Sequence, residues 1–251
     1  MKDYQAKIVK NEKIAENIYA VTFDLGETAN VRAGQFGDIA VGGTHLLRRP
    51  IAICKAEGNT VTFCYQVKGE GTQKLKTMGA GTVLNVLMPL GNGFFVSESE
   101  NKVALVGGGV GIFPLISVIR EYGNDKEISS FIGFRNKNAV CGLEEFAKSA
   151  SFTAVTDDGS YGEKMNAVQA FSQALQTGYR PDVVLSCGPT PMLRALKKVT
   201  EEANIPCYVS LEERMGCGIG ACLVCVCDLT NGEHARVCKD GPVFNASEVM
   251  L

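Results

Sequence analysis

Residues 102–114 read Lys-Val-Ala-Leu-Val-Gly-Gly-Gly-Val-Gly-Ile-Phe-Pro, an apolar strand that runs into a glycine-rich turn and the start of a helix. Such a unit lets the N–H groups of a helix N-terminus approach a pyrophosphate, and proline suits the first helical turn. Gly107, Gly109 and Gly111 are therefore candidate nucleotide-binding positions. The alternative interpretation is a turn whose glycines serve only tight packing.

Outward from this stretch, residues 99–211 alternate between apolar strand candidates and helical patterns. Strands are expected at 103–106, 128–133, 152–155, 183–186 and 208–211. Helices are expected at 112–121, 143–148, 167–177 and 191–203. The alternation predicts a parallel sheet with helices on both faces. The second strand ends in Gly-Phe-Arg-Asn-Lys and lacks the acidic residue expected about 20 residues after the turn of a Rossmann fold, which leaves NAD versus NADP open.

Residues 1–98 show a different pattern, with short β-branched and aromatic runs separated by glycine or asparagine. Strand candidates lie at 6–9, 18–25, 36–40, 51–55, 61–67 and 83–87. This pattern predicts a small antiparallel barrel, with one helix at 71–78 inserted before the last strand.

Residues 212–251 carry a distinctive set of cysteines. Cys217-x4-Cys222-x2-Cys225, followed by the distant Cys238, is the plant-type spacing that holds a [2Fe–2S] cluster. The intervening glycines allow the backbone to wrap closely around the cluster, so that N–H groups point at the sulfides. We therefore expect a cluster-binding loop appended to the second domain. A zinc site and disulfides are weaker alternatives, because zinc usually takes two short cysteine pairs and Cys238 has no close partner.

The remaining cysteines are expected to be buried thiols. Cys227 is interpreted as a buried spare thiol, because its use as a ligand would change the two-residue spacing. The others lie mostly in apolar runs and are expected in the core: Cys54, Cys64, Cys141, Cys187 and Cys207.

The composition is that of an ordinary globular protein. The 251 residues are 45% hydrophobic and 21% charged, with a formal net charge of −2. This balance fits two domains of usual size and gives no sign of a nucleic-acid or membrane partner. The N-terminus lacks a signal peptide and no run reaches the length of a membrane span, so we expect a cytoplasmic protein with reduced thiols.

The barrel region contains a candidate anion site. Arg48 and Arg49 stand immediately before a strand, and Gly-Glu-Gly-Thr at 69–72 opens the inserted helix. Backbone N–H groups and a hydroxyl at such a helix start can bind an anion. A solvated basic turn is the alternative.

Together these motifs resemble the ferredoxin-reductase family over nearly the whole chain. They are Arg-Pro-Ile-Ala at 49–52, Gly-Glu-Gly-Thr at 69–72, Pro-Leu-Gly-Asn-Gly-Phe at 89–94, the Gly-Gly-Gly-Val-Gly turn, and Cys-Gly-Pro-x-x-Met at 187–192. With the appended cysteine loop, the chain most closely resembles the electron-transfer subunits of NAD-dependent (class B) dihydroorotate dehydrogenases. The stretch from Ser210 to Cys222 is the most diagnostic.

The resemblance implies the fold class β + α/β. It comprises an N-terminal antiparallel FAD-binding barrel (1–98), a parallel-sheet NAD-binding domain (99–211) and a [2Fe–2S] loop extension (212–251). At the family's phosphate motif stand Arg49, Pro50, Ile51 and Ala52, with Ala52 in place of the usual serine. The other implied flavin positions are Tyr65, Gln66, Val67, Gly71 and Thr72. Cys187 and Gly188 are implied near the nicotinamide, with Asp158 on a neighbouring loop.

The resemblance also implies a function. Electrons would pass from a separate FMN-bearing dihydroorotate dehydrogenase subunit, in a heterotetramer with two copies of each chain, through the cluster and FAD to NAD+ in pyrimidine (UMP) biosynthesis. No residue is expected to act as a general acid or base, and His45 and His234 are expected to be exposed loop residues. The alternatives are a related subunit for ferredoxin:NADP reduction, sulfide oxidation or a hydrogenase, and a zinc-stabilised, flavin-free binding module.

Overall fold

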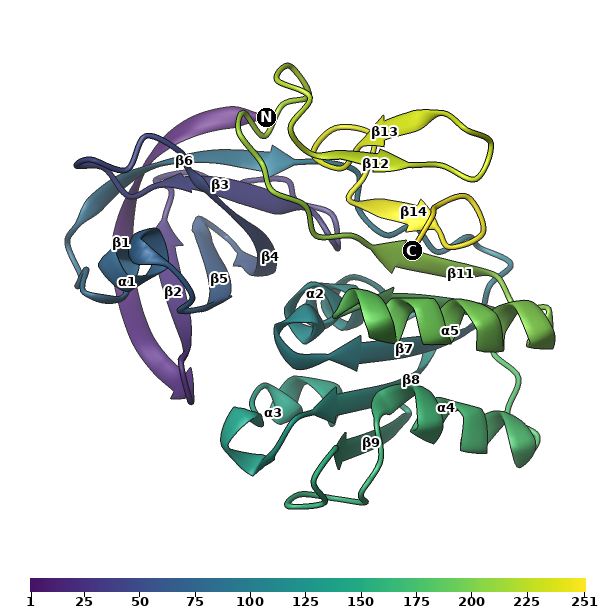
Figure 1. Cartoon of the computed structure of the whole chain (residues 1–251). Helices are drawn as coiled ribbons and strands as arrows, with labels where there is room; N and C mark the ends of the chain where they lie inside the picture. Colours follow the sequence, from purple (N-terminus) through teal and green to yellow (C-terminus); the bar gives the residue numbers. More distant parts are fainter.

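The N-terminal strands close into an antiparallel barrel in the computed structural model, which describes all 251 residues (Figure 1). The strands are β1 (Lys2–Ala15), β2 (Ile18–Asp24), β3 (Phe36–Ala40), β4 (Arg49–Glu57), β5 (Thr60–Gln66) and β6 (Val83–Leu90), in the order β1-β2-β5-β4-β3-β6. Alternate residues of each strand face the interior, as Tyr4, Ala6 and Ile8 of β1 do. Helix α1 (Glu70–Lys76) lies between β5 and β6, where the sequence predicts it.

The second half of the chain forms a sheet that is parallel except for its last strand. Its strands are β7 (Lys102–Gly108), β8 (Glu127–Phe134), β9 (Ser151–Thr156), β10 (Val183–Cys187), β11 (Cys207–Ser210) and β14 (Val243–Asn245), in the order β14-β11-β10-β7-β8-β9. The helices are α2 (Ile112–Tyr122), α3 (Leu143–Phe146), α4 (Ala167–Gln176) and α5 (Thr190–Ala203), with short 3₁₀ turns η1 (Gly109–Gly111) and η2 (Lys137–Ala139). The predicted fold class is confirmed. Every helix falls short of the length and apolarity that a membrane crossing requires.

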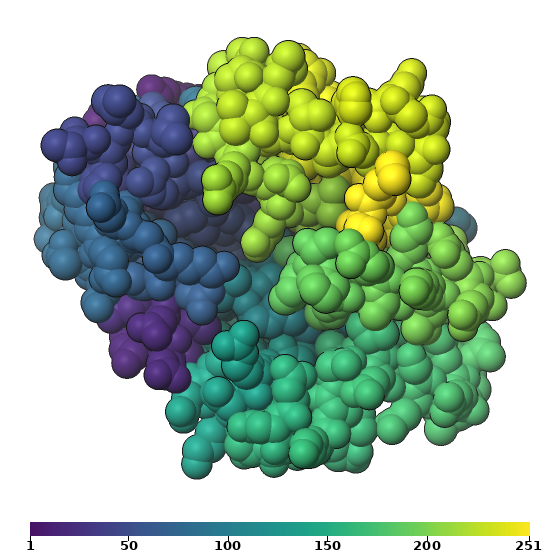
Figure 2. All heavy atoms as spheres, viewed as in Figure 1, coloured from purple at the N-terminus to yellow at the C-terminus, as the bar shows by residue number.

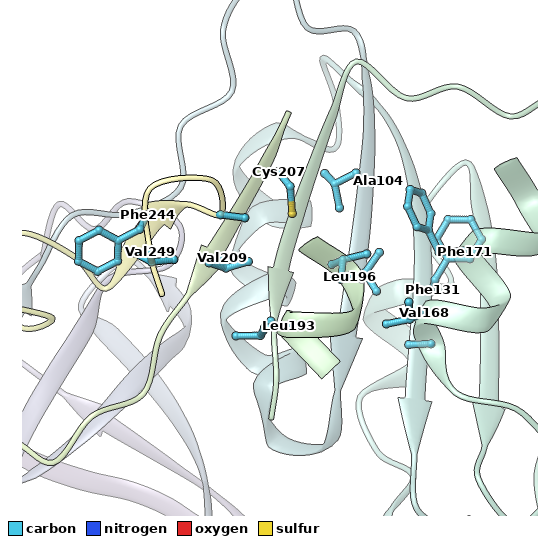
Figure 3. Close-up of a cluster of buried hydrophobic side chains, with 14 of the residues drawn as sticks. Ala104, Phe131, Val168, Phe171, Leu193, Leu196, Cys207, Val209, Phe244 and Val249 are labelled. Atoms are coloured by element: carbon cyan, nitrogen blue, oxygen red, sulfur yellow. The ribbon is translucent and has the colours of Figure 1, made fainter. Parts of the chain in front are cut away.

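The central strand β7 is buried on both faces, as its unbroken apolar run indicates. Ala104 and Val106 belong to one core cluster, whereas Val103 and Leu105 belong to another that contains the apolar side of α2. On the first face, side chains of α4 and α5 pack against the sheet (Figure 3). There the rings of Phe131 and Phe171 meet edge to face, with centroids 5.4 Å apart.

The C-terminal extension contains strands that the sequence did not predict. β12 (Val226–Asp228) and β13 (His234–Arg236) form a hairpin, and β14 pairs antiparallel with β11. Figure 3 shows Phe244 and Val249 of the extension beside Val209 of β11. The predicted domain boundaries at 98 and 211 stay predictions, and the extension shares the sheet of the domain before it.

An ionic cluster joins the barrel to the α/β domain. Glu145 of α3 is only 5% exposed and lies 2.6 Å from the Lys55 ammonium of β4, 3.2 Å from the guanidinium of Arg120 and 2.6 Å from Lys148. Arg120 also pairs with Glu57 of β4. Burial opposes ionisation of Glu145, but hydrogen bonds from Lys148 and Lys55 outweigh it and lower its pKa to about 2. The strand that carries the predicted flavin motif is thereby tied to the helices of the α/β domain.

Candidate functional site

A cavity of about 280 Å³ lies where the barrel, the glycine turn and the start of the C-terminal extension meet. Figure 2 shows the hollow between the blue barrel surface, the yellow-green extension and the teal α/β part. Its lining includes the predicted residues Arg49, Pro50, Ile51, Ala52, Tyr65, Gln66, Thr72, Gly111 and Cys187. Segments far apart in the sequence thus form one site.

Arg49 lies against the start of α1. A Cβ on Gly71 would overlap its guanidinium, so only glycine allows this contact. Nη1 of Arg49 donates to the carbonyl oxygens of Leu47 (2.7 Å) and Arg48 (3.0 Å). The Thr72 hydroxyl accepts from the N–H groups of Lys68 and Gly69, which caps the helix. These contacts hold the arginine at the edge of the cavity. The Thr72 hydroxyl, which is predicted to contact the flavin phosphates, caps α1 in this structure.

The glycines of the nucleotide turn have different neighbours. A Cβ on Gly107 would lie 2.8 Å from Leu115 Cδ1, and one on Gly111 would lie 2.6 Å from the backbone of Cys187 and Gly188. These glycines permit close packing of the turn on the sheet. Gly109 has a φ of +56° and nothing within 4 Å of a Cβ, so the space beside it is open. The turn therefore combines both sequence-level interpretations, packing and an open approach to a helix N-terminus.

Cys187 lies near polar residues that the sequence analysis did not assign to the site. β10 and β11 run parallel with Cys187 opposite Ser210, and Glu212 and Glu213 follow at the same edge of the cavity. Burial raises the pKa of Cys187 to about 12, Glu212 adds to the shift, and a hydrogen bond with Ser210 partly offsets it. The thiol is therefore neutral at physiological pH. The signal that could have found Ser210 is its place at the carboxyl end of a parallel strand, where ligands of such sheets bind.

The cysteine loop directs backbone N–H groups at its sulfurs. Cys217 Sγ accepts from the N–H groups of Ile219 (3.5 Å), Ala221 (3.3 Å) and Cys222 (3.4 Å). The N–H of Gly220 points at Cys238 Sγ (3.1 Å), and that of Cys238 at Cys225 Sγ (3.4 Å). Burial opposes ionisation of Cys217, but its three N–H donors and a hydrogen bond with the Cys222 side chain outweigh it and lower its pKa to about 6.

The donor set fits a group carried by thiolates, because amide donors stabilise negative charge on sulfur. The thiols of Cys217 and Cys222 share a hydrogen bond, as do those of Cys225 and Cys238. No three potential ligands are gathered at metal-binding distances, so the four-ligand assignment stays a prediction.

Comparison with known proteins identifies relatives of this chain. The model of the iron-sulfur cluster binding domain of dihydroorotate dehydrogenase B matches residues 212–250. The dihydroorotate dehydrogenase B (NAD(+)) electron transfer subunit of Caldanaerobacter subterraneus subsp. tengcongensis is 37% identical over 250 residues, which is 98% of each chain. That of Bacillus pumilus is 42% identical over 262 residues, covering 100% of this chain and 99% of the relative.

The chain belongs to the family of dihydroorotate dehydrogenase B (NAD(+)) electron transfer subunits. The resemblance inferred from its motifs is confirmed. Among solved structures, an NADH-dependent reduced ferredoxin-NADP oxidoreductase aligns with a TM-score of 0.88 at 26% identity, covering 98% of this chain and 89% of that chain. Phthalate dioxygenase reductase shares the fold, with a TM-score of 0.69 at 17% identity and 93% of each chain covered.

Some positions predicted from the glycine turn or from the family resemblance lie outside the cavity lining. These are Val67, Gly71, Gly107, Gly109, Asp158 and Gly188. Gly71 and Gly188 nevertheless touch lining residues. Asp158 follows the edge strand β9 and accepts hydrogen bonds from Ser160, so the structure does not bring it to the site. Tyr65 is 3% exposed, and its ring stacks on Tyr19, so it belongs mainly to the barrel core.

Three side chains outside the site differ in part from the burial or loop position that the sequence predicted for them. Cys227 is half-buried on β12 rather than buried, because the two-stranded hairpin leaves one of its faces partly open. The loop residue His45 is only 17% exposed and lies 4.0 Å from Glu70. His234 is exposed but belongs to strand β13, where its Nδ1 lies 2.8 Å from Asp228 Oδ1. Cys54, Cys64, Cys141, Cys187 and Cys207 are buried, as predicted.

Proposed function

We propose that this chain carries electrons from an FMN-bearing dihydroorotate dehydrogenase subunit to NAD+, in the order [2Fe–2S] cluster, FAD, nicotinamide, during pyrimidine (UMP) biosynthesis. The observation that carries the proposal is a cavity shared by several segments. It joins residues 49–52, the turn at Gly111 and Cys187 to Glu212, Glu213 and Met215, which lead into the cysteine loop. Family membership supports it, because the relatives are named NAD(+)-linked electron transfer subunits.

In this proposal the two nucleotides take separate positions along the cavity. FAD, when bound, exchanges a hydride with nicotinamide and single electrons with an iron–sulfur centre. Arg49 holds the flavin diphosphate through charge-assisted hydrogen bonds, and Pro50, Ile51 and Ala52 form the wall beside it. The start of α2 at Gly111 receives the nicotinamide nucleotide's pyrophosphate. Cys187 and Ser210 orient the nicotinamide as uncharged hydrogen-bonding groups.

The cysteine loop holds the cluster through Cys217, Cys222, Cys225 and Cys238. The amide donors to three of these sulfurs favour the thiolate state that a cluster requires. The loop lies next to the cavity, so its electron has a short route to the flavin. The hydride that leaves for NAD+ would combine two electrons from the cluster with one proton that the flavin takes up from water, and the hydride transfer itself needs no general acid or base.

The catalytic partner meets the chain at the cysteine loop in this proposal. Apolar side chains there are exposed: Ile219 is 43% exposed, Leu223 62% and Val224 56%. Exposed apolar residues that neighbour one another are typical of protein contact sites. We assign these residues to the contact with the FMN-bearing subunit, in a heterotetramer with two copies of each chain. The cytoplasmic location expected from the sequence is part of the same proposal.

Purification alone and with the FMN-bearing subunit tests this function. The isolated chain should be coloured, contain flavin, iron and acid-labile sulfide, and oxidise NADH with an artificial acceptor. It should be inert toward dihydroorotate until the partner is added, when dihydroorotate-dependent NAD+ reduction should appear. A colourless, zinc-containing chain would support the binding module instead. Reduction of NADP+ by a different copurifying subunit would support a related reductase.

A further inference from the structure

Asp38 is a buried carboxyl group with an oxygen that has no hydrogen-bond partner. The residue is 1% exposed, and Oδ1 lacks any hydrogen-bond partner. Its neighbours Gly37 and Ile39 face the barrel interior, so Asp38 faces outward from β3. A buried carboxyl group without its full set of partners is costly, which makes this position unusual for a strand that otherwise packs apolar groups.

The cysteine loop covers this carboxyl group directly. A Cβ on Gly218 would lie 2.8 Å from Asp38 Oδ2, so the loop backbone rests on the carboxylate oxygen. Gly218 also has a φ of +69°, which favours glycine at the same point. The residue that contacts Asp38 therefore lies between the predicted ligands Cys217 and Cys222.

The cavity begins next to Asp38. Phe36, two residues earlier on the same face of β3, lines the cavity, and Pro50, which pairs with Asp38 across the strands, lines it as well. Asp38 therefore lies beside both the cavity lining and the cysteine loop. It is the carboxylate that the fold buries at this junction.

The surrounding cations leave the carboxylate without a direct ion pair. Arg48 donates from Nη1 to the backbone oxygens of Asp38 (3.2 Å) and Asn85 (3.4 Å), and its Nη2 lies 3.7 Å from the carboxylate of Asp3. Burial raises the pKa of Asp38 to about 6, although the charges of Arg48 and Arg49 partly offset this. From β6, the uncharged Asn85 presents a second buried oxygen without a partner.

We propose that Asp38 sets how electrons are shared between the flavin and the iron–sulfur cluster. This role rests on the proposed function. A negative charge in a poorly solvated site opposes addition of a further electron to the cluster beside it, and cluster potentials depend on local charge. In the proposed direction the electron reaches the cluster from the FMN-bearing subunit and leaves it for the flavin, without any bond being made or broken. Asp38 is thus a positioning and tuning residue, not a catalytic one.

Redox titration of the Asp38→Asn protein loaded with FAD and cluster tests this role. At pH 8 the substitution removes the charge and keeps the shape, so the electron distribution should move about tenfold toward the reduced cluster, which is about 59 mV for a one-electron couple. Electron paramagnetic resonance of the reduced cluster supplies the readout. Asp3→Asn is the matched control, because Asp3 also neighbours Arg48 but its side chain is 55% exposed. It should leave the cluster potential unchanged.

Two outcomes separate this role from the function on which it rests. If the wild-type and Asp38→Asn proteins both hold flavin and cluster and have the same cluster potential, the role of Asp38 alone is overturned. A wild-type chain that holds neither flavin nor cluster would overturn both. If Asp38→Asn loses its cluster, the wild-type protein is titrated between pH 8 and pH 5 instead. Its cluster potential should rise as Asp38 gains a proton, and a flat profile would overturn the proposal.

Discussion

Two glycine-rich segments of this chain look alike in sequence but use glycine for different physical reasons. At 107–111, Gly107 and Gly111 are required because a Cβ would strike Leu115 or the backbone of Cys187. At 216–220, Gly218 and Gly220 have positive φ, and the Gly220 N–H reaches Cys238 Sγ. In the first segment glycine allows close packing of the turn on the sheet, whereas in the second it allows a curved backbone that presents N–H donors. A glycine pattern alone therefore does not distinguish close packing from ligand contact.

The largest effect should come from the sulfurs that the second segment surrounds. Cys225→Ser should abolish the cluster, because Cys225 is buried within the predicted ligand set. Iron and acid-labile sulfide content of the purified protein measures the loss.

Cys227→Ser is the matched control, two residues away on β12 and outside the predicted ligand set. It should keep full iron and sulfide content. Cluster loss in Cys227→Ser together with retention in Cys225→Ser would reverse the ligand assignment.

The next largest effect, on the stability of the fold, should come from the closely packed turn at 107–111. In Gly111→Ala the new Cβ would lie 2.6 Å from backbone atoms of Cys187 and Gly188, which cannot rotate away. Overpacking of this kind costs about 3 kcal/mol, equivalent to a midpoint of thermal unfolding lower by roughly 6–12 °C for a chain of this size. Differential scanning calorimetry measures it. An unchanged midpoint would mean that the turn and β10 are not in close contact.

The smallest effect should come from Gly109, which lies in the same turn but has open space around it. Gly109→Ala should lower the free energy of unfolding by about 1 kcal/mol, because only the positive φ of +56° is unfavourable for alanine. The midpoint of thermal unfolding should fall by roughly 2–4 °C. If Gly109→Ala proved as damaging as Gly111→Ala, strain rather than packing would dominate the turn.

Much of the fold follows from local patterns in the sequence. β3 coincides with its predicted span, and α2 differs from its prediction by one residue, because period and turn residues determine such boundaries. The barrel residues 49–52 and the turn at Gly111 meet in one cavity, as the family resemblance implied. Motifs that bind one ligand must converge, so recognising several of them together constrains the tertiary structure.

The features that the sequence did not reveal depend on long-range contacts. β12, β13 and β14 are three residues each, too short for a periodic signal. Ser210 gains its place opposite Cys187 only through parallel pairing of β10 and β11. In the sequence Asp38 looks like an ordinary polar residue of a strand. Its burial depends on the contact with Gly218 of the cysteine loop. Each depends on a neighbour far along the chain.

Strand β14 has a consequence for the lifetime of the folded protein. It pairs with β11 at Ser210, Val209 and Tyr208, and so covers backbone groups that would otherwise form an open side of the sheet. Open sheet sides recruit other chains into intermolecular pairing, and short antiparallel covers are one way in which proteins prevent it. A chain cleaved by a protease before residue 212 would lose this cover along with the cysteines. The same forty residues that carry the predicted cluster ligands therefore also end this side of the sheet in a three-residue strand, which offers other chains a shorter edge for pairing.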